Sequence, residues 1–242
     1  AGQASAGAVD MSAIRLSDGT IRMYYFGSFT TTTDPGSFQP DDLWRFYAAD
    51  SSDGLNFTEI GQVLVTGNSI TDPAVLRMGD GSYRMYISKG TQVLSAVADS
   101  NGLTFNFESG DRNNNHGGVP GAILTPTGSV RLFYGYTGGG IYSKLSDDGV
   151  SFTTSTGDEM IPATGNTVSD ANPYLISGNT YVMAYKITPT GGSSPQDDQT
   201  WFATSADGVS WTVTSNNPID TMSVPSIVEA SDGSLWVYGL AH

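Results

Sequence analysis

Three aspartates occupy the same position in a repeated sequence pattern. When five copies of a hairpin motif are aligned on their turns without gaps, Asp10, Asp72 and Asp170 share one column with Val119 and Val224. Like charges gathered in a partly desolvated space raise one another's pKa, and carboxyl groups with separated pKa values can serve as acid and base. An aspartate at a strand start also caps its own turn in many proteins. Both roles are open for each aspartate taken alone. The common register of the three aspartates favours a functional site.

The hairpin motif consists of a short apolar run, a tight turn and a second apolar strand. Its turns are Asp18-Gly19, Asp80-Gly81, Thr127-Gly128, Gly178-Asn179 and Asp232-Gly233. Gly and, less readily, Asn accept the positive φ that such turns require. Each copy therefore predicts an inner strand A that begins near the aspartate column, a turn, and a returning strand B.

A second motif follows four of these hairpins. It is Asp-Gly or Asn-Gly with an aromatic residue three places further on, and its glycines are Gly54, Gly102, Gly149 and Gly208. The intervals of 48, 47 and 59 residues between them lie in the range of propeller blades. We interpret this motif as the turn between strands C and D of a four-stranded antiparallel blade.

Five A–B hairpins and four C–D turns predict an all-β, five-bladed β-propeller whose last blade has only its inner two strands. The fold would be a single domain over residues 1–242, with blades at about 9–65, 66–112, 113–164, 165–218 and 219–242. An open strand edge favours association. We expect the N-terminal segment, a neighbouring subunit or residues outside this sequence to cover it.

Composition limits the ligand classes. A net charge of −14 argues against nucleic acid and against anionic membrane surfaces, and favours a neutral or cationic ligand. The absence of cysteine excludes disulfides and thiolate chemistry. No apolar run approaches the roughly 20 residues that span a bilayer. The start Ala-Gly-Gln-Ala, which lacks Met, is consistent with a processed, exported protein or with a sequence that was simply trimmed, and we expect a secreted or extracellular protein.

Two long B-to-C connections, 27–42 and 188–199, should lie on the same face as the starts of the A strands. Long loops often carry function. Trp44 and Trp201 follow these loops, and either could stack on a sugar or belong to the core. Asn172 is a further candidate for ligand binding. The acidic pairs Asp41-Asp42 and Asp197-Asp198 could hold Ca²⁺, although they lack a recognisable ligand spacing, and no other cofactor is expected.

His116 and three arginines complete the set of candidates. His116 is expected near the same mouth, where it could bind a sugar or a metal, act as an acid, or be a solvated loop residue. Arg22, Arg84 and Arg131 share one position in strand B. Their recurrence indicates a structural brace, with each guanidinium pairing an acidic or carbonyl partner between blades.

The aspartates also resemble a known group. Asp10, in Val9-Asp10-Met11-Ser12-Ala13-Ile14, resembles the Asp of blade one in the five-bladed propeller glycosidases. Asp72, in Thr71-Asp72-Pro73, resembles the Asp-Pro of blade two in the same group. The group comprises the arabinanases and β-xylosidases, with the related invertases and levansucrases. The resemblance covers nearly the whole chain. It implies that Asp10 is the base or nucleophile and that Asp72 is a stabiliser or pKa modulator.

The third element of that group is absent. Its acid, a Glu in blade three, corresponds to Gly118 in His116-Gly117-Gly118-Val119-Pro120. The chain has four glutamates, and none is well placed to protonate a leaving group: Glu59, Glu108, Glu159 and Glu229. Ordinary glycosidase chemistry therefore requires a substitute acid, for which Asp170 is the candidate.

Three functional hypotheses follow. The favoured one is an extracellular carbohydrate-associated propeller that binds a neutral saccharide at its axial funnel, with weak or lost hydrolase activity. The second is an active glycoside hydrolase on furanose- or xylose-type sugars that uses Asp10 and Asp72. The third is a self-assembling structural propeller, a homo-oligomer in which a neighbouring subunit completes the last blade.

Overall fold

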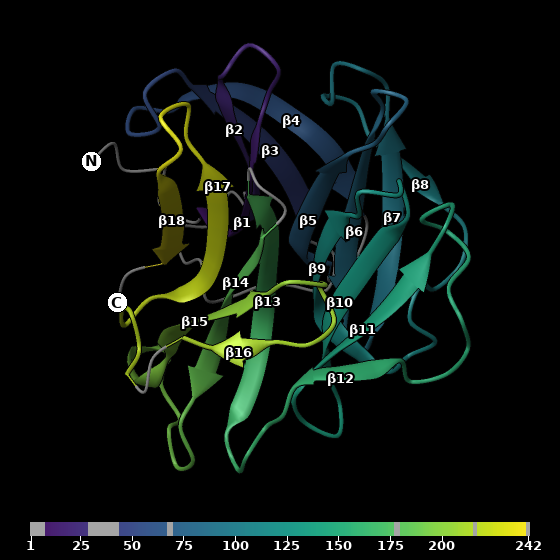
Figure 1. Ribbon diagram of the computed structural model, residues 1–242. Helices are drawn as coiled ribbons and strands as arrows, with labels where there is room; N and C mark the ends of the chain where they lie inside the picture. Colours follow the sequence, from purple (N-terminus) through teal and green to yellow (C-terminus); the bar gives the residue numbers. More distant parts are fainter. Residues whose placement is uncertain (1–7, 29–43, 67–69, 177–179, 215–216, 241–242) are drawn as a thin grey trace.

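The computed structural model describes residues 8–28, 44–66, 70–176, 180–214 and 217–240. Within these residues the chain forms antiparallel sheets arranged around a central axis, together with one 3-10 turn, η1 (Pro195–Asp197) (Figure 1). The first three sheets are β1 (Ala8–Arg15) to β4 (Thr58–Thr66), β5 (Thr71–Arg77) to β8 (Asn106–Glu108), and β9 (Gly117–Leu124) to β12 (Asp158–Ile161). The last two are β13 (Thr167–Ile176) to β16 (Thr212–Val213), and the pair β17 (Ser223–Glu229) and β18 (Leu235–Leu240).

In each four-stranded sheet the strands are neighbours in chain order and form a meander, with the second and third strands in the middle. They are β2 (Ile21–Ser28), β3 (Trp44–Ser51), β6 (Tyr83–Lys89), β7 (Gln92–Ala98), β10 (Val130–Tyr136), β11 (Ile141–Ser146), β14 (Thr180–Thr188) and β15 (Gln199–Ser205). The described residues thus form four four-stranded sheets and one two-stranded sheet, as the count of hairpins and turns predicts. What covers the outer edge of β18 stays a prediction.

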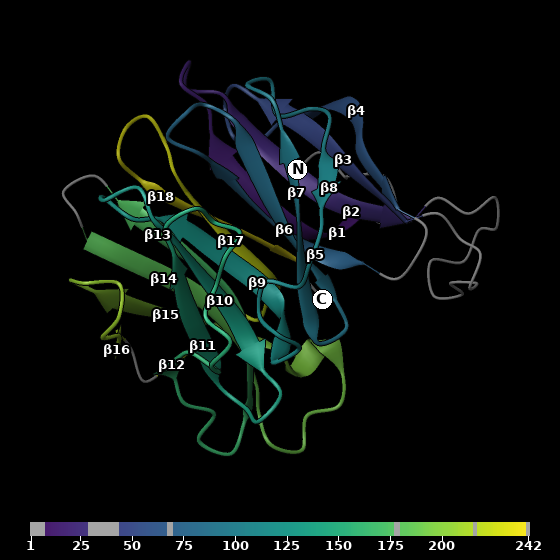
Figure 2. The ribbon, with the colours of Figure 1, turned by 90° about the vertical axis from the view of Figure 1, so that its right-hand side faces the viewer.

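Hydrogen bonds between the inner strands close the ring. Ser12 Oγ of β1 accepts from the backbone N–H of Val75, at 3.0 Å, and Asn172 Oδ1 of β13 accepts from the N–H of Ile227, at 2.7 Å. Ser226 Oγ of β17 accepts from the N–H of Ala13, at 2.8 Å, over 213 residues of sequence. The two-stranded sheet is therefore attached to both of its neighbours, and Figures 1 and 2 show β17 between β1 and β13.

Edge-to-face aromatic pairs join neighbouring blades. In each pair the aromatic residue of a C–D turn packs against a strand B aromatic of the preceding blade, with ring centroids 5.7 to 6.2 Å apart. The pairs are Phe105 with Tyr24, Phe152 with Tyr86, Trp211 with Phe133, and Phe57 with Tyr238. The aromatic residue of the repeated motif is thus an interblade contact, and the last pair joins β18 to the first blade.

The repeated arginines act as braces. Arg22 forms two hydrogen bonds of 2.7 Å with the carboxylate of Asp50 and donates to the carbonyl oxygen of Asn101 in the next blade, at 2.6 Å. Arg84 makes the equivalent contacts with Glu108 and with the carbonyl oxygen of Asp148. The predicted brace is confirmed for these two residues. Arg131 instead donates to Ser143 Oγ within its own blade, at 3.0 Å.

Candidate axial carboxylate site

The five residues of the aspartate column share one unusual backbone conformation. Their φ angles are 51° for Asp10, 56° for Asp72, 54° for Val119, 53° for Asp170 and 51° for Val224. Each lies at a shift in register between an inner strand and its strand B partner. The left-handed region is uncommon outside glycine; Asp enters it more readily than a β-branched Val does. The column is therefore a ring of five equivalent bends, and we call it the axial ring.

The axial ring surrounds one pocket on the propeller axis. All five of its members line this pocket, together with Pro73, Pro120 and Pro225, which follow three of them. The space between the described side chains has a volume of about 20 Å³, which is enough for about one water molecule. The structure therefore brings the three aspartates together, as the alignment predicts. A sugar ring would have to lie over this pocket, because it cannot enter it.

Asp10 is the most perturbed of the three carboxyl groups. Burial, together with the nearby charges of Asp72 and Asp170, raises its pKa to about 8, while a hydrogen bond from the backbone of Asp72 and the charge of Lys186 oppose the rise. At neutral pH Asp10 consequently carries a proton.

Asp72 is less perturbed because hydroxyl groups stabilise its charge. Burial and the charge of Asp170 raise its pKa to about 6, while hydrogen bonds from Thr71 and Ser88 oppose the rise. Thr71 Oγ1 lies 2.5 Å from Asp72 Oδ2. At pH 7 Asp72 is mostly ionised, so the two carboxyl groups differ in protonation state.

Asp170 is held by an ion pair. Its Oδ2 lies 2.7 Å from Lys186 Nζ and accepts a hydrogen bond of 2.8 Å from Ser169 Oγ. Lys186 Nζ is also 3.6 Å from Asp198 Oδ2. Burial lowers the pKa of Lys186, but Asp170 and the other carboxylates outweigh it and the pKa is raised overall. Asp170 thus has a counter-ion of its own.

Sequence reasoning missed Lys186 and Ser88, yet the same alignment could have found them. Both stand sixteen residues after the column aspartate of their blade, near the end of strand B. At that place each one contacts the aspartate of its own blade, Ser88 contacting Asp72 and Lys186 contacting Asp170. A polar residue sixteen positions after a column aspartate is therefore the sequence signal for a group that shifts the pKa of that aspartate.

Asn172 lines the axial pocket, while His116 does not. Asn172 Oδ1 is already occupied by the N–H of Ile227. His116 lies at the junction of blades two and three, with its Nδ1 2.7 Å from the carbonyl oxygen of Asn113 and 3.4 Å from Lys144 Nζ. The structure therefore separates His116 from the aspartates.

The two candidate tryptophans also lie away from the pocket lining. Trp201 Nε1 donates to Gln199 Oε1, at 3.1 Å, and its ring packs against the core between blades three and four. Trp44 begins β3, and its side chain lies outside the described part of the structure.

Gly118 has no room for a side chain. A Cβ atom on Gly118 would lie 2.5 Å from the carbonyl oxygen of Gly90 and 2.7 Å from Ser88 Oγ. Ser88 Oγ in turn accepts a hydrogen bond of 2.7 Å from the backbone N–H of Val119. At the position where the resemblance places the acid Glu, backbone and a buried hydroxyl fill the space.

The acidic loop residues are engaged with their own surroundings. Asp197 accepts from the N–H groups of Ser193 and Ser194 and caps η1, and Asp198 accepts from Thr188 Oγ1 and faces Lys186. Asp41 and Asp42 lie outside the described residues. Among the residues that are described, no three acidic or histidine side chains are grouped as metal ligands. No helix in this part of the chain is long and apolar enough to span a membrane.

Solved structures of similar fold are glycoside hydrolases. A thermostable family-43 glycoside hydrolase superposes with a TM-score of 0.71 at 16% identity, covering 96% of this chain and 82% of that one. A family-43 β-xylosidase/α-arabinofuranosidase from a compost microbial metagenome, solved with xylotriose, gives 0.69 at 19%, covering 96% and 84%. The chain has the fold of the β-propeller glycoside hydrolases.

Two further structures agree. An endo-arabinase from Bacteroides thetaiotaomicron has a TM-score of 0.71 at 13% identity, covering 96% of this chain and 89% of that one. A family-117 glycoside hydrolase from Zobellia galactanivorans has 0.65 at 17%, covering 93% and 74%. No family model and no curated protein matches the sequence. At such identities the likeness shows the glycoside hydrolase propeller fold, and function must be argued from the site.

Proposed function

We propose that this propeller binds a neutral saccharide over the axial ring and has weak or lost hydrolase activity. The observation that supports it most is the convergence of Asp10, Asp72 and Asp170, in one backbone conformation, on a single pocket. Carboxyl oxygens accept hydrogen bonds from sugar hydroxyls, and a protonated carboxyl also donates one. Secretion, which such a ligand would suit, stays a prediction.

Weak activity is proposed because the pocket is small and its proton donor is unusual. Because the pocket holds only about 20 Å³, a sugar lying over it would contact the carboxyl oxygens of the axial ring that face outward. The sugar would not pass between the carboxyl groups. Gly118 supplies no acid. Hydrolysis of a glycoside requires one carboxyl group that gives a proton and a second that acts as base or nucleophile.

An active hydrolase is the second candidate, and the protonation states favour it. With pKa values of about 8 and about 6, Asp10 holds a proton at pH 7 while Asp72 does not. Asp10 would then be the general acid and Asp72 the base or stabiliser, which reverses the role that the family resemblance implies for Asp10. Asp170, whose charge is offset by Lys186, would act on the site through its effect on the other two groups, because it raises the pKa of both Asp10 and Asp72.

One experiment tests both candidates. Aryl glycosides and neutral arabino- and xylo-oligosaccharides would be screened by calorimetry and by release of product, using the wild type, Asp10→Asn and Asp72→Asn. Asn keeps the left-handed conformation accessible, so the backbone should be retained. Asp80→Asn is the matched control. Asp80 follows β5, the strand that contains Asp72 near its start, at the opposite end, where it caps a turn.

The outcomes separate the candidates. Binding that weakens at least fivefold in the ring variants and persists in Asp80→Asn supports the saccharide site. Turnover lost in the same variants supports the hydrolase. Binding and turnover unchanged in both Asp10→Asn and Asp72→Asn would remove the axial ring from the function.

A further inference from the structure

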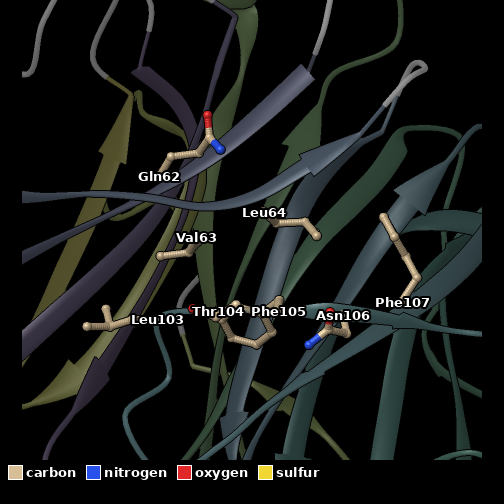
Figure 3. Close-up of a pocket in the computed structure, with 8 residues that line it drawn as sticks. All are labelled: Gln62, Val63, Leu64, Leu103, Thr104, Phe105, Asn106 and Phe107. Carbon is tan, nitrogen blue, oxygen red and sulfur yellow. The ribbon is translucent and has the colours of Figure 1, made fainter.

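A groove lies on the rim of the propeller between the first and second blades. It has a volume of about 370 Å³ and is lined by residues 62–64 of β4 and by residues 103–107, which lead into β8 (Figure 3). The backbone N–H of Phe105 donates to the carbonyl oxygen of Val63, at 3.0 Å, and fixes the two segments together. None of these residues lines the axial pocket.

The lining of the groove is neutral and mixed in polarity. None of its eight residues is charged, although the chain carries 24 acidic and 10 basic side chains. Gln62, Thr104 and Asn106 present exposed amide and hydroxyl groups. Val63, Leu64 and Phe105, each 5% exposed, are the buried apolar residues, and Phe107 is 45% exposed. The groove therefore offers hydrogen-bonding groups beside an accessible aromatic ring.

We propose that this groove is a second saccharide-binding site, specific for an uncharged sugar unit. A sugar ring has an apolar C–H face that can pack on an aromatic side chain, and its hydroxyls need partners that both donate and accept, as the amides of Gln62 and Asn106 do. The volume falls within the range of small-molecule sites. The lack of charge selects against uronic acids and other anions. The site shares only its ligand class with the proposed function.

A peptide strand fits the groove less well. Adding a strand to a sheet requires a regular run of free backbone groups along the edge. The pairing of β4 with β3 has two shifts in register, which bend this edge strand, and β8 has three residues. Bulges and short edge strands are features that block strand addition. The exposed side chains, rather than the backbone edges, are the recognition elements.

Affinity electrophoresis in gels that contain a neutral polysaccharide tests the proposal. Arabinan, arabinoxylan and agarose would be the neutral probes, with polygalacturonate as the anionic counterpart. The variants are Phe107→Ala and Gln62→Ala with Asn106→Ala, and the control is Leu145→Ala, whose side chain is 44% exposed on β11 of the third blade. Thermal unfolding of each variant checks that the fold is retained.

We expect the wild type and Leu145→Ala to be retarded in at least one neutral gel and not in polygalacturonate. Loss of one stacked ring should weaken retention about tenfold in Phe107→Ala. Asp72→Asn serves as the axial variant: retention that persists in it and falls in Phe107→Ala assigns binding to the groove, whatever happens at the axial ring. Absence of retardation in all neutral gels, or retardation unchanged in the groove variants, would overturn the proposal.

Discussion

Lys186 Nζ lies 2.7 Å from Asp170 Oδ2, and this contact gives one of three neighbouring carboxyl groups a counter-ion. The other two, Asp10 and Asp72, have no such counter-ion at that distance among the described residues. The axial ring therefore holds three chemically identical side chains in three different electrostatic environments.

Replacing Lys186 with Met should destabilise the protein by about 3 kcal/mol, because removing one partner leaves a buried charge unpaired. Asp170→Asn in the same background should recover much of that loss. Denaturant unfolding of the two single variants and the double variant measures the coupling. If the changes in unfolding free energy caused by the two single substitutions added up to the change in the double variant, the ion pair would have no stabilising role.

Asp10→Asn should make the protein less sensitive to alkaline pH. A carboxyl pKa raised to about 8 means that the folded state binds more protons than the unfolded state between about pH 4 and pH 8, so stability falls as pH rises through that window. Asn removes this contribution. We expect the stability of the variant relative to wild type to rise throughout the window from pH 4.5 to pH 8, by up to about 1.4 kcal/mol for each pH unit.

Thermal unfolding over this pH range measures the effect, and Asp80→Asn is the control, because its stability relative to wild type should not change between pH 4.5 and pH 8. Hydrogen bonds from Ser82 lower the pKa of Asp80, so its contribution is present above about pH 4 and lost in acid. A difference between wild type and Asp10→Asn that did not change with pH would contradict the assignment of a protonated Asp10.

Val224→Asn should stabilise the fold by about 1 kcal/mol, because a β-branched residue at φ 51° is strained and Asn accepts this conformation. Val213→Asn is the matched control. Val213 lies in β16, is 43% exposed and is not among the residues with positive φ, so the change should bring no gain. Equal effects of the two substitutions in chemical unfolding would argue against strain at the axial ring.

Ser226→Ala should loosen the two-stranded sheet. The N–H of Ala13 would lose its acceptor at a buried position, at a cost of about 1–3 kcal/mol. Hydrogen exchange should then accelerate in β17 and β18 more than in β13 and β14. Ser231→Ala, at an exposed residue of the same hairpin, should leave exchange unchanged; protection retained in Ser226→Ala would show that closure does not depend on this bond.

Much of the scaffold could be predicted from the sequence because turn chemistry repeats at fixed spacing. Positive φ at Gly19 and Gly81, and at Gly54 and Gly102, is needed wherever the strands turn back. Copies of such turns give strand number, order and register together. The register then places Asp10, Asp72 and Asp170 in one column, and the structure places them in one pocket.

The chemistry of the site was less accessible because it depends on packing. Burial, which no local motif reports, raises the pKa of Asp10. His116 contacts Asn113 and Lys144 and is not part of the axial pocket lining, and no motif in the sequence predicts these contacts. The left-handed backbone of Val119 and Val224 could not be read from residues that normally avoid it.

The five bends of the axial ring have nearly the same φ whether the residue is Asp or Val. The main chain at these places is consequently set by the surrounding sheets, and the side chain is free to vary. Substitutions at these five positions could change the side chains that line the axial pocket one at a time, while the backbone stays the same. A designer could install acids, amides or histidines at the two valine positions and so use the propeller as a host for new binding or catalytic sets.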